Sequence, residues 1–176
     1  LDDVWDESVA YMLRQASWKF ALRVVQLDVD ADVTIQFGQA LPYSIPTDFV
    51  RLAGIALDPD FTVEIPDYDE HDGHWWIVGG GVIELRYTSN DAHYGLDLGK
   101  WPVEFSKAHA IYLAAQAGLQ ITKSGATKQA LESEHMRMLH RAKSLDAMGD
   151  AVKRKPMGTW TRSRLSRGQA GRLRGF

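Results

Sequence analysis

The densest group of side chains that could perform chemistry lies in the stretch DYDEHDGH, residues 67–74. Its carboxylates and histidines are ligand types that calcium and zinc use. A calcium loop also needs a closing glutamate at a fixed distance, and none follows here. Zinc needs three or four converging ligands, which His71 and His74 cannot supply alone. The segment therefore predicts a solvated hairpin or loop without a metal. A metal-dependent enzyme built on it is the alternative.

A second pair, Glu132 and His135, has the i, i+3 spacing of helix bundles that bind two iron ions. Such a site needs a second pair of this kind and two more glutamates. The other predicted helices provide only Glu7 and Glu104. We therefore interpret His135 as a residue of a helix surface or of a contact between subunits.

Other signatures of catalysis are missing from the sequence. The chain has no cysteine, which excludes a thiol nucleophile, a disulfide scaffold and a thiolate-held metal. The triplet Gly79–Gly81 lacks the following lysine and serine or threonine of a phosphate-binding loop, and no G-x-S-x-G motif occurs. We predict a protein that is not an enzyme and needs no cofactor. Four tryptophans fall in apolar patterns typical of a core: Trp5, Trp18, Trp75 and Trp76.

Residues 151–176 differ from the rest of the chain in charge. They hold eight of the 20 basic residues and no acidic residue, which gives them a charge of +8. The other 12 basic residues face 23 acidic ones, so the rest of the chain carries −11. This asymmetry predicts an arm that meets nucleic acid or the acidic face of another protein. The alternative is a disordered basic terminus without a single partner.

Trp160 stands in this arm among arginine, glycine and small polar residues. Tryptophan and arginine dominate the binding energy of protein interfaces, so we predict that Trp160 docks into a pocket of a partner. The alternative is that the arm folds back on its own domain. The residues assigned to the binding arm are Lys155, Trp160, Arg162, Arg164 and Arg167.

Hydrophobic periodicity predicts three helices, at 2–19, 102–121 and 126–150. The expected fold class is α+β: a helical bundle with a long C-terminal helical hairpin, a small antiparallel β insertion and an extended basic arm. We expect residues 1–152 to form one domain and residues 153–176 to form the arm. No apolar run approaches the roughly 18 residues that a membrane span needs, so no membrane partner is expected.

The β insertion is expected at about residues 21–88. Pro42 and Pro46 predict a loop between its first strand and the rest. The glycine triplet 79–81 predicts the turn of a hairpin. The predicted strands after the loop are 49–57, 61–65, 74–78 and 82–88.

The ordered set of segments resembles the head-to-tail adaptor proteins of tailed bacteriophages, and is similar to the tail tubular protein A group. The resemblance covers most of the chain. Members of the family usually have one more helix before the segment that begins here at Leu1. The segments that carry the resemblance are ASWKFALRVVQL, LPYSIPTDFVRLAGI, VIELRYT, WPVEFSKAHAIYLAA, GATKQALESEHMRMLHRAKSLDAM and GTWTRSR.

The resemblance implies a structural protein that forms a dodecameric ring under the portal of the DNA-filled head and carries the tail on its other side. It implies that the helices build the ring, that the β insertion faces tail or stopper proteins, and that the C-terminal arm reaches the portal. Double-stranded DNA would pass through without sequence-specific binding, and an acidic lumen would let it slide. The implied location is the neck of a virion, or of a phage-like particle such as a gene transfer agent, assembled in the host cytoplasm.

A nucleic-acid-binding module that acts through the basic tail stays open as an alternative function. Eight positive charges can neutralise phosphates. The acidic body and the scarcity of aromatic side chains in the tail argue against it. Salt-dependent retention of DNA by the isolated protein would favour this alternative.

Overall fold

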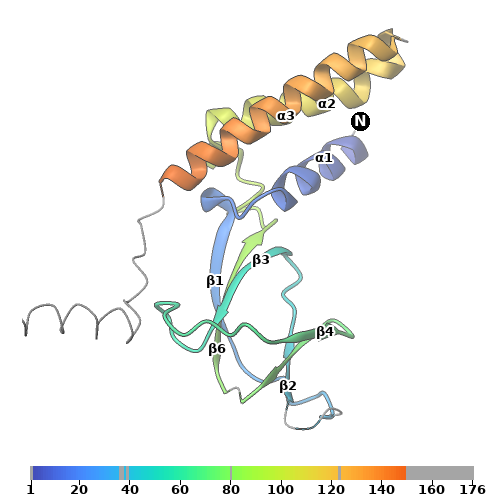
Figure 1. Cartoon of the computed structure of the whole chain (residues 1–176). Helices are drawn as coiled ribbons and strands as arrows, with labels where there is room; N and C mark the ends of the chain where they lie inside the picture. Colours follow the sequence, from blue (N-terminus) through green and yellow to red (C-terminus); the bar gives the residue numbers. More distant parts are fainter. Residues whose placement is uncertain (1, 36–37, 39, 80, 123, 150–176) are drawn as a thin grey trace, which may run out of the picture.

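The protein is elongated, with helices at one end and strands at the other (Figure 1). The computed structural model describes residues 2–35, 38, 40–79, 81–122 and 124–149. Three α-helices lie in this part of the chain: α1 (Asp2–Arg14), α2 (Val103–Thr122) and α3 (Gly125–Met148). The strands are β1 (Leu22–Leu27), β2 (Ala40–Ser44), β3 (Phe49–Ala56), β4 (Asp69–His71), β5 (His74–Val78) and β6 (Ile83–Ser89). Two short 3₁₀ helices, η1 (Lys19–Ala21) and η2 (Leu98–Lys100), complete the set.

The helices form a layer in which α2 packs against both α1 and α3. The buried face of α2 includes Phe105, Ala108 and Ala115. Ser124 caps the N-terminus of α3 by accepting a hydrogen bond from the backbone of Thr127. The buried core of the layer consists of Val9, Met12, Leu13, Trp18, Ala21, Phe105, Ala108, Leu139 and Ala142.

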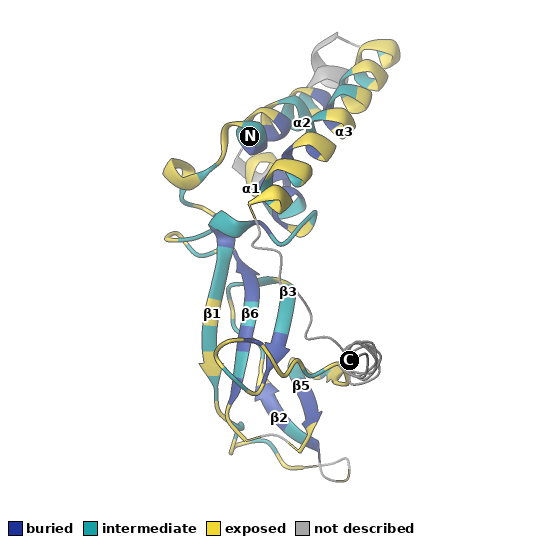
Figure 2. Ribbon diagram, turned by 60° about the vertical axis from the view of Figure 1, so that its left-hand side comes forward, coloured by how far each residue is buried: buried dark blue, intermediate teal, exposed yellow. Residues whose placement is uncertain are grey.

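The strands form two antiparallel sheets, ordered β1-β6-β3 and β2-β5-β4. The two sheets share one core to which both contribute aromatic side chains. Figure 2 shows this β module as a body with its own buried interior, apart from the helical layer. Its buried residues are Tyr43, Ile55, Trp75, Ile77, Ile83, Leu85 and Tyr87.

The predicted fold class, a helical bundle with a long C-terminal hairpin and a small β insertion, is wrong. Two three-stranded sheets with a core of their own make up one end of the molecule, and the three helices are a layer at the other end. Helical periodicity is a strong local signal in a sequence. Short strands buried on one face gave a weaker signal.

Three local predictions within the β module are also wrong. Strands β5 and β6 belong to different sheets, so they do not form the hairpin that the glycine triplet predicted. The predicted loop around Pro42 contains strand β2, which tolerates proline because it is an edge strand. The predicted strand 61–65 is reduced to an isolated bridge between Ala56 and Glu64.

The acidic segment 67–74 is a tight hairpin between β4 and β5, as the sequence predicted. Asp72 and Gly73 form its turn, with φ angles of 53° and 74°. Positive φ at both turn residues matches the twist of an antiparallel pair, and the sequence Asp-Gly favours it. His71 and His74 face each other across the first pair of the ladder.

Candidate functional site

The five residues predicted to form the binding arm lie outside the described residues. The surface next to the start of the arm is described, however, and it holds a groove. The groove lies between η1, the N-terminal turn of α2 and the C-terminal end of α3, and its volume is about 300 Å³. We call it the arm-root groove because Gly149, directly after α3, is part of its wall. Its lining residues are Trp18, Lys19, Pro102, Glu104, Phe105, Ala142, Leu145, Asp146 and Gly149.

The floor of the arm-root groove is aromatic and its rim is charged. Trp18 and Phe105 meet edge to face, with ring centroids 5.0 Å apart. At the rim, the backbone N–H of Lys19 donates to Asp146 Oδ1 at 3.3 Å, and Lys19 Nζ donates to the backbone carbonyl of Asp146. These bonds hold η1 against the last turns of α3.

Apolar side chains remain exposed around this groove. Leu145 in its wall is 44% exposed, and Met148 and Val103, which neighbour lining residues in the chain, are 80% and 61% exposed. Large apolar side chains gathered beside a concave site are typical of a contact surface.

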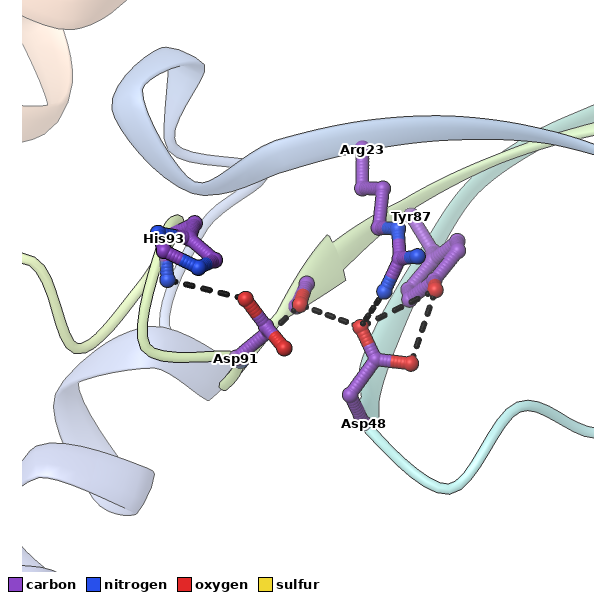
Figure 3. Close-up of polar contacts among 6 residues, drawn as sticks. Arg23, Asp48, Tyr87, Asp91 and His93 are labelled. Carbon is purple, nitrogen blue, oxygen red and sulfur yellow. Dashed lines mark hydrogen bonds and ion pairs between the residues drawn. The ribbon is translucent and has the colours of Figure 1, made fainter.

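A second cluster, which we call the Asp48 centre, lies where the β module meets the helical layer (Figure 3). Asp48, just before β3, accepts hydrogen bonds from Arg23 Nη1 at 2.9 Å and from Tyr87 Oη at 2.9 and 3.0 Å. The hydroxyl of Ser89 donates to the same carboxylate. Ser89 in turn accepts from the backbone N–H of Asp91 at 3.0 Å. The centre thus joins β1, β3 and β6 to the loop that leads toward α2.

The electrostatics of the Asp48 centre favour the ionised carboxylate. Burial by itself raises the pKa of Asp48, but the hydrogen bonds from Ser89, Tyr87 and Arg23 outweigh it and hold the pKa below its ordinary value. Burial, together with the hydrogen bond to Asp48, raises the pKa of Tyr87 far above its usual range. The carboxylate is satisfied by groups of its own chain, which makes the centre a structural clasp.

Gly95 continues this clasp toward the helices. Its N–H donates to the carbonyl of Ser89 at 3.1 Å, and its own carbonyl accepts from Trp101 Nε1 at 2.9 Å. A Cβ atom at this position would lie 2.2 Å from the Ser89 carbonyl oxygen and 2.9 Å from a methyl group of Leu13. Only glycine therefore fits between the end of β6 and α1.

Ser8 and His109 form a buried pair between α1 and α2 that superficially resembles a nucleophile and its base. The Ser8 hydroxyl donates to the carbonyl of Trp5 at 2.6 Å, so it must accept from His109 Nε2 at 2.8 Å. This direction is the reverse of the one that activates a serine nucleophile. Burial, with a smaller contribution from His135, lowers the pKa of His109. The pair is a neutral packing contact.

The interpretation of His135 as a surface or subunit-contact residue is wrong. The residue is only 4% exposed, and its Nδ1 lies 3.0 Å from the carbonyl of Ala108, to which it donates. Glu132, in contrast, is exposed, and its Oε1 atom lies 3.6 Å from Lys128 Nζ. The two residues therefore do not share a site. Within the described ranges, no group of three or more histidine, cysteine, aspartate or glutamate side chains could hold a metal.

The prediction that the tryptophans are core residues is confirmed for Trp18, Trp75 and Trp76. Trp5 is 38% exposed and stacks on Trp101, with ring centroids 6.2 Å apart. The prediction of a core position is therefore wrong for Trp5, whose side chain is partly in solvent.

The sequence reasoning missed the Asp48 centre and the Ser8–His109 pair. The members of each lie far apart in the sequence, so no local spacing reveals them. One signal was present: Tyr87 and Ser89 alternate on β6, which places two hydroxyl groups on the same face at the end of a buried strand.

No protein-family model matches this chain, and no curated protein matches it either. Of the helices that the structure describes, none combines the length and the apolar character that crossing a membrane would take.

Proposed function

We propose that the protein is a structural adaptor that docks as a ring on the portal of a phage or phage-like particle and connects it to the tail. The observation that carries the proposal is the two-ended build of the molecule. A helical layer and a β module, each with its own core, meet where α1 contacts β3, and the Asp48 centre fastens the strands to the loop that leads to α2. A protein that couples two different partners needs two distinct surfaces held at a fixed separation.

The helical end is the proposed ring and portal side. Exposed Leu145, Met148 and Val103 supply apolar contact area there, and the basic arm begins directly beyond α3. Ring closure requires two different complementary faces on each subunit. The exposed faces of α1 and α3, which both pack against α2, are the candidates for these faces.

The β end is the proposed tail side. Val78 is 71% exposed and Val82 46%, and they lie at the end of β5 and just before β6. The start of β6 lies away from the helices, because Ile83 pairs with Leu27, the end of β1 farthest from η1. The acidic hairpin 67–74 adds a charged, solvated surface to the same module. Such a mixed surface suits a contact with tail or stopper proteins.

The arm is the proposed anchor on the portal. Trp160 would fill an apolar pocket of the portal protein, while Arg162, Arg164 and Arg167 would pair with its acidic groups. DNA would pass through a lumen that the acidic body keeps electronegative, without sequence-specific contacts.

The test is assembly on purified portal rings, followed by electron microscopy and by a binding measurement. Wild type should form a ring on the portal, and deletion of residues 156–176 should abolish attachment. Trp160→Ala should weaken binding by about 2 kcal/mol, or roughly 30-fold, the scale of an interface hot spot. The matched control is Leu165→Ala, which removes an apolar side chain from the same arm and should change binding little.

Two results would contradict the adaptor function. One is normal attachment of the truncated protein to portals. The other is binding of wild type to naked DNA that falls steeply with salt and is lost on truncation, with no dependence on the portal. The second result would identify the arm as a nucleic-acid-binding tail.

A further inference from the structure

We propose that, in the unassembled subunit, the arm folds back and Trp160 of the same chain occupies the arm-root groove. The observations behind this inference are the shape and lining of the groove, the place where the chain leaves α3, and the charge on the arm. The inference does not depend on the adaptor function. If both hold, the docked arm would regulate the attachment of the adaptor to the portal.

The groove has room for an aromatic side chain. Its volume of about 300 Å³ is at the lower end of the range for small-ligand pockets. Trp18 and Phe105, which pack edge to face, lie in its floor but are only 1% and 0% exposed. An indole in the groove would therefore gain from burial against the apolar wall rather than from stacking on these rings. Leu145, exposed in the wall, would be covered by the same ring.

The chain between Gly149 and Trp160 keeps this tryptophan close to the groove. Gly149 is part of the groove wall, and Trp160 follows it by eleven residues. Eleven extended residues span at most about 40 Å, so the chain can reverse and return to its own starting point. Pro156 and Gly158, which lie between, are residue types that favour a reversal. A short tether gives an effective concentration near millimolar, which lets even a weak site be occupied.

The charges on the two sides are complementary. Glu104 and Asp146 are both partly buried in the lining, and the one basic lining residue, Lys19, is already bonded to Asp146. The arm carries Arg162 and Arg164 directly after Trp160. An arginine that pairs with a half-buried carboxylate forms a charge-assisted hydrogen bond, stronger than a neutral one.

This contact would act as a latch on the arm. In the proposed function the same tryptophan binds the portal, so a docked Trp160 is withheld until a portal competes for it. The apparent affinity for the portal falls by the fraction of subunits in which the arm is free. Glu104→Lys, which weakens the latch without changing a residue assigned to the portal contact, should therefore bind portals more tightly than wild type.

The test uses the full chain and takes advantage of the absence of cysteine. A single cysteine at Ser163→Cys carries a nitroxide spin label, and electron paramagnetic resonance reports its mobility. The wild-type background should give an immobile component that does not change when the protein is diluted. Leu145→Asp and Glu104→Lys, each in the groove wall, and Trp160→Ala should each remove that component. Met136→Asp, on the exposed face of the same helix outside the groove, should keep it.

The outcomes separate the latch from its alternatives. A freely mobile label in the wild-type background, or one that Leu145→Asp and Glu104→Lys leave immobile, overturns the latch. An immobile component that disappears on dilution also overturns it, because the arm would then dock on a second copy of the chain. Circular dichroism confirms that the groove variants keep their helical content. Portal binding is measured in a separate experiment. The latch can therefore be refuted while the adaptor function stands, and the adaptor function can be refuted while the latch stands.

Discussion

Asp48→Asn should destabilise the protein strongly, although it changes a single atom of the side chain. The carboxylate is 16% exposed and accepts hydrogen bonds from a guanidinium and two hydroxyl groups. An amide keeps one acceptor oxygen and turns the other position into a donor, which then faces hydroxyl and guanidinium donors. Arg23 also loses the carboxylate that balances its charge.

The magnitude follows from the number and kind of bonds lost. A hydrogen bond to a charged group contributes about 1.5–3 kcal/mol, and the substitution removes or inverts about two of them. The bond from Arg23 counts for less, because that side chain is 34% exposed and water screens the pair. We expect a loss of about 2–4 kcal/mol in the free energy of unfolding.

The assay is urea unfolding at pH 7 and again at lower pH. The pKa of Asp48 in the folded protein lies below its ordinary value of 3.8, so the stabilisation is complete above about pH 5. It is lost as the pH falls through the folded pKa, and the difference between wild type and Asp48→Asn should shrink in that range. The matched control is Glu84→Gln on the same strand, whose carboxylate takes part in an exposed hydrogen bond with Gln26. The control should change stability by less than about 0.5 kcal/mol.

Equal urea midpoints for wild type and Asp48→Asn at pH 7 would refute the clasp. A difference that does not shrink as the pH is lowered from 5 through the ordinary aspartate pKa of 3.8 would refute its electrostatic origin, since the unfolded chain then takes up a proton that the folded carboxylate resists.

Two further substitutions test the helical layer. Gly95→Ala should lower the free energy of unfolding by about 1–3 kcal/mol, because the added Cβ would meet the backbone of β6. Thermal unfolding measures this loss. The control is Gly81→Ala, which should be nearly neutral because its Cβ meets nothing within 4 Å. Burial lowers the pKa of His109 in the folded protein. Wild type should therefore be most stable above the ordinary histidine pKa of 6.5 and should lose stability as the pH falls below it. His109→Gln should flatten that loss between pH 7 and 5, whereas His140→Gln, exposed on α3, should leave the slope of melting temperature against pH unchanged.

The sequence predicted the helices better than the arrangement of the strands. Helices α2 and α3 start and end within about two residues of their predicted bounds, because their apolar spacing and the break between them are local signals. The first helix ends at Arg14, earlier than predicted, and the chain then turns through η1 to enter β1. The bounds of β3, β5 and β6 were also close, since runs of β-branched and aromatic residues mark them.

The predictions that were wrong concern features that depend on contacts between residues far apart in the sequence. The sequence predicted that β6 pairs with β5, its neighbour in the chain. In the structure β5 lies in the other sheet, because the pairing of β6 depends on the core that its alternating side chains join. Pro42 masked an edge strand, because proline is compatible with an edge but not with a centre. The burial of His135 depends on the carbonyl of Ala108 in another helix, which no spacing within α3 reveals.

The position of β6 has a consequence for the way the chain folds. It is the last of the described strands along the chain and yet the central strand of its sheet, where it pairs with β1 on one side and β3 on the other. While the chain is being synthesised, β1 and β3 have no partner until residues 83–89 emerge. The pairing of Leu22 with Thr88 then closes a loop that contains almost the entire β module. Closure of such long loops is slow, whereas α2 and α3 are neighbours in the chain and pack through local contacts. We therefore expect the pairing of β6, rather than the formation of the helices, to limit the rate of folding.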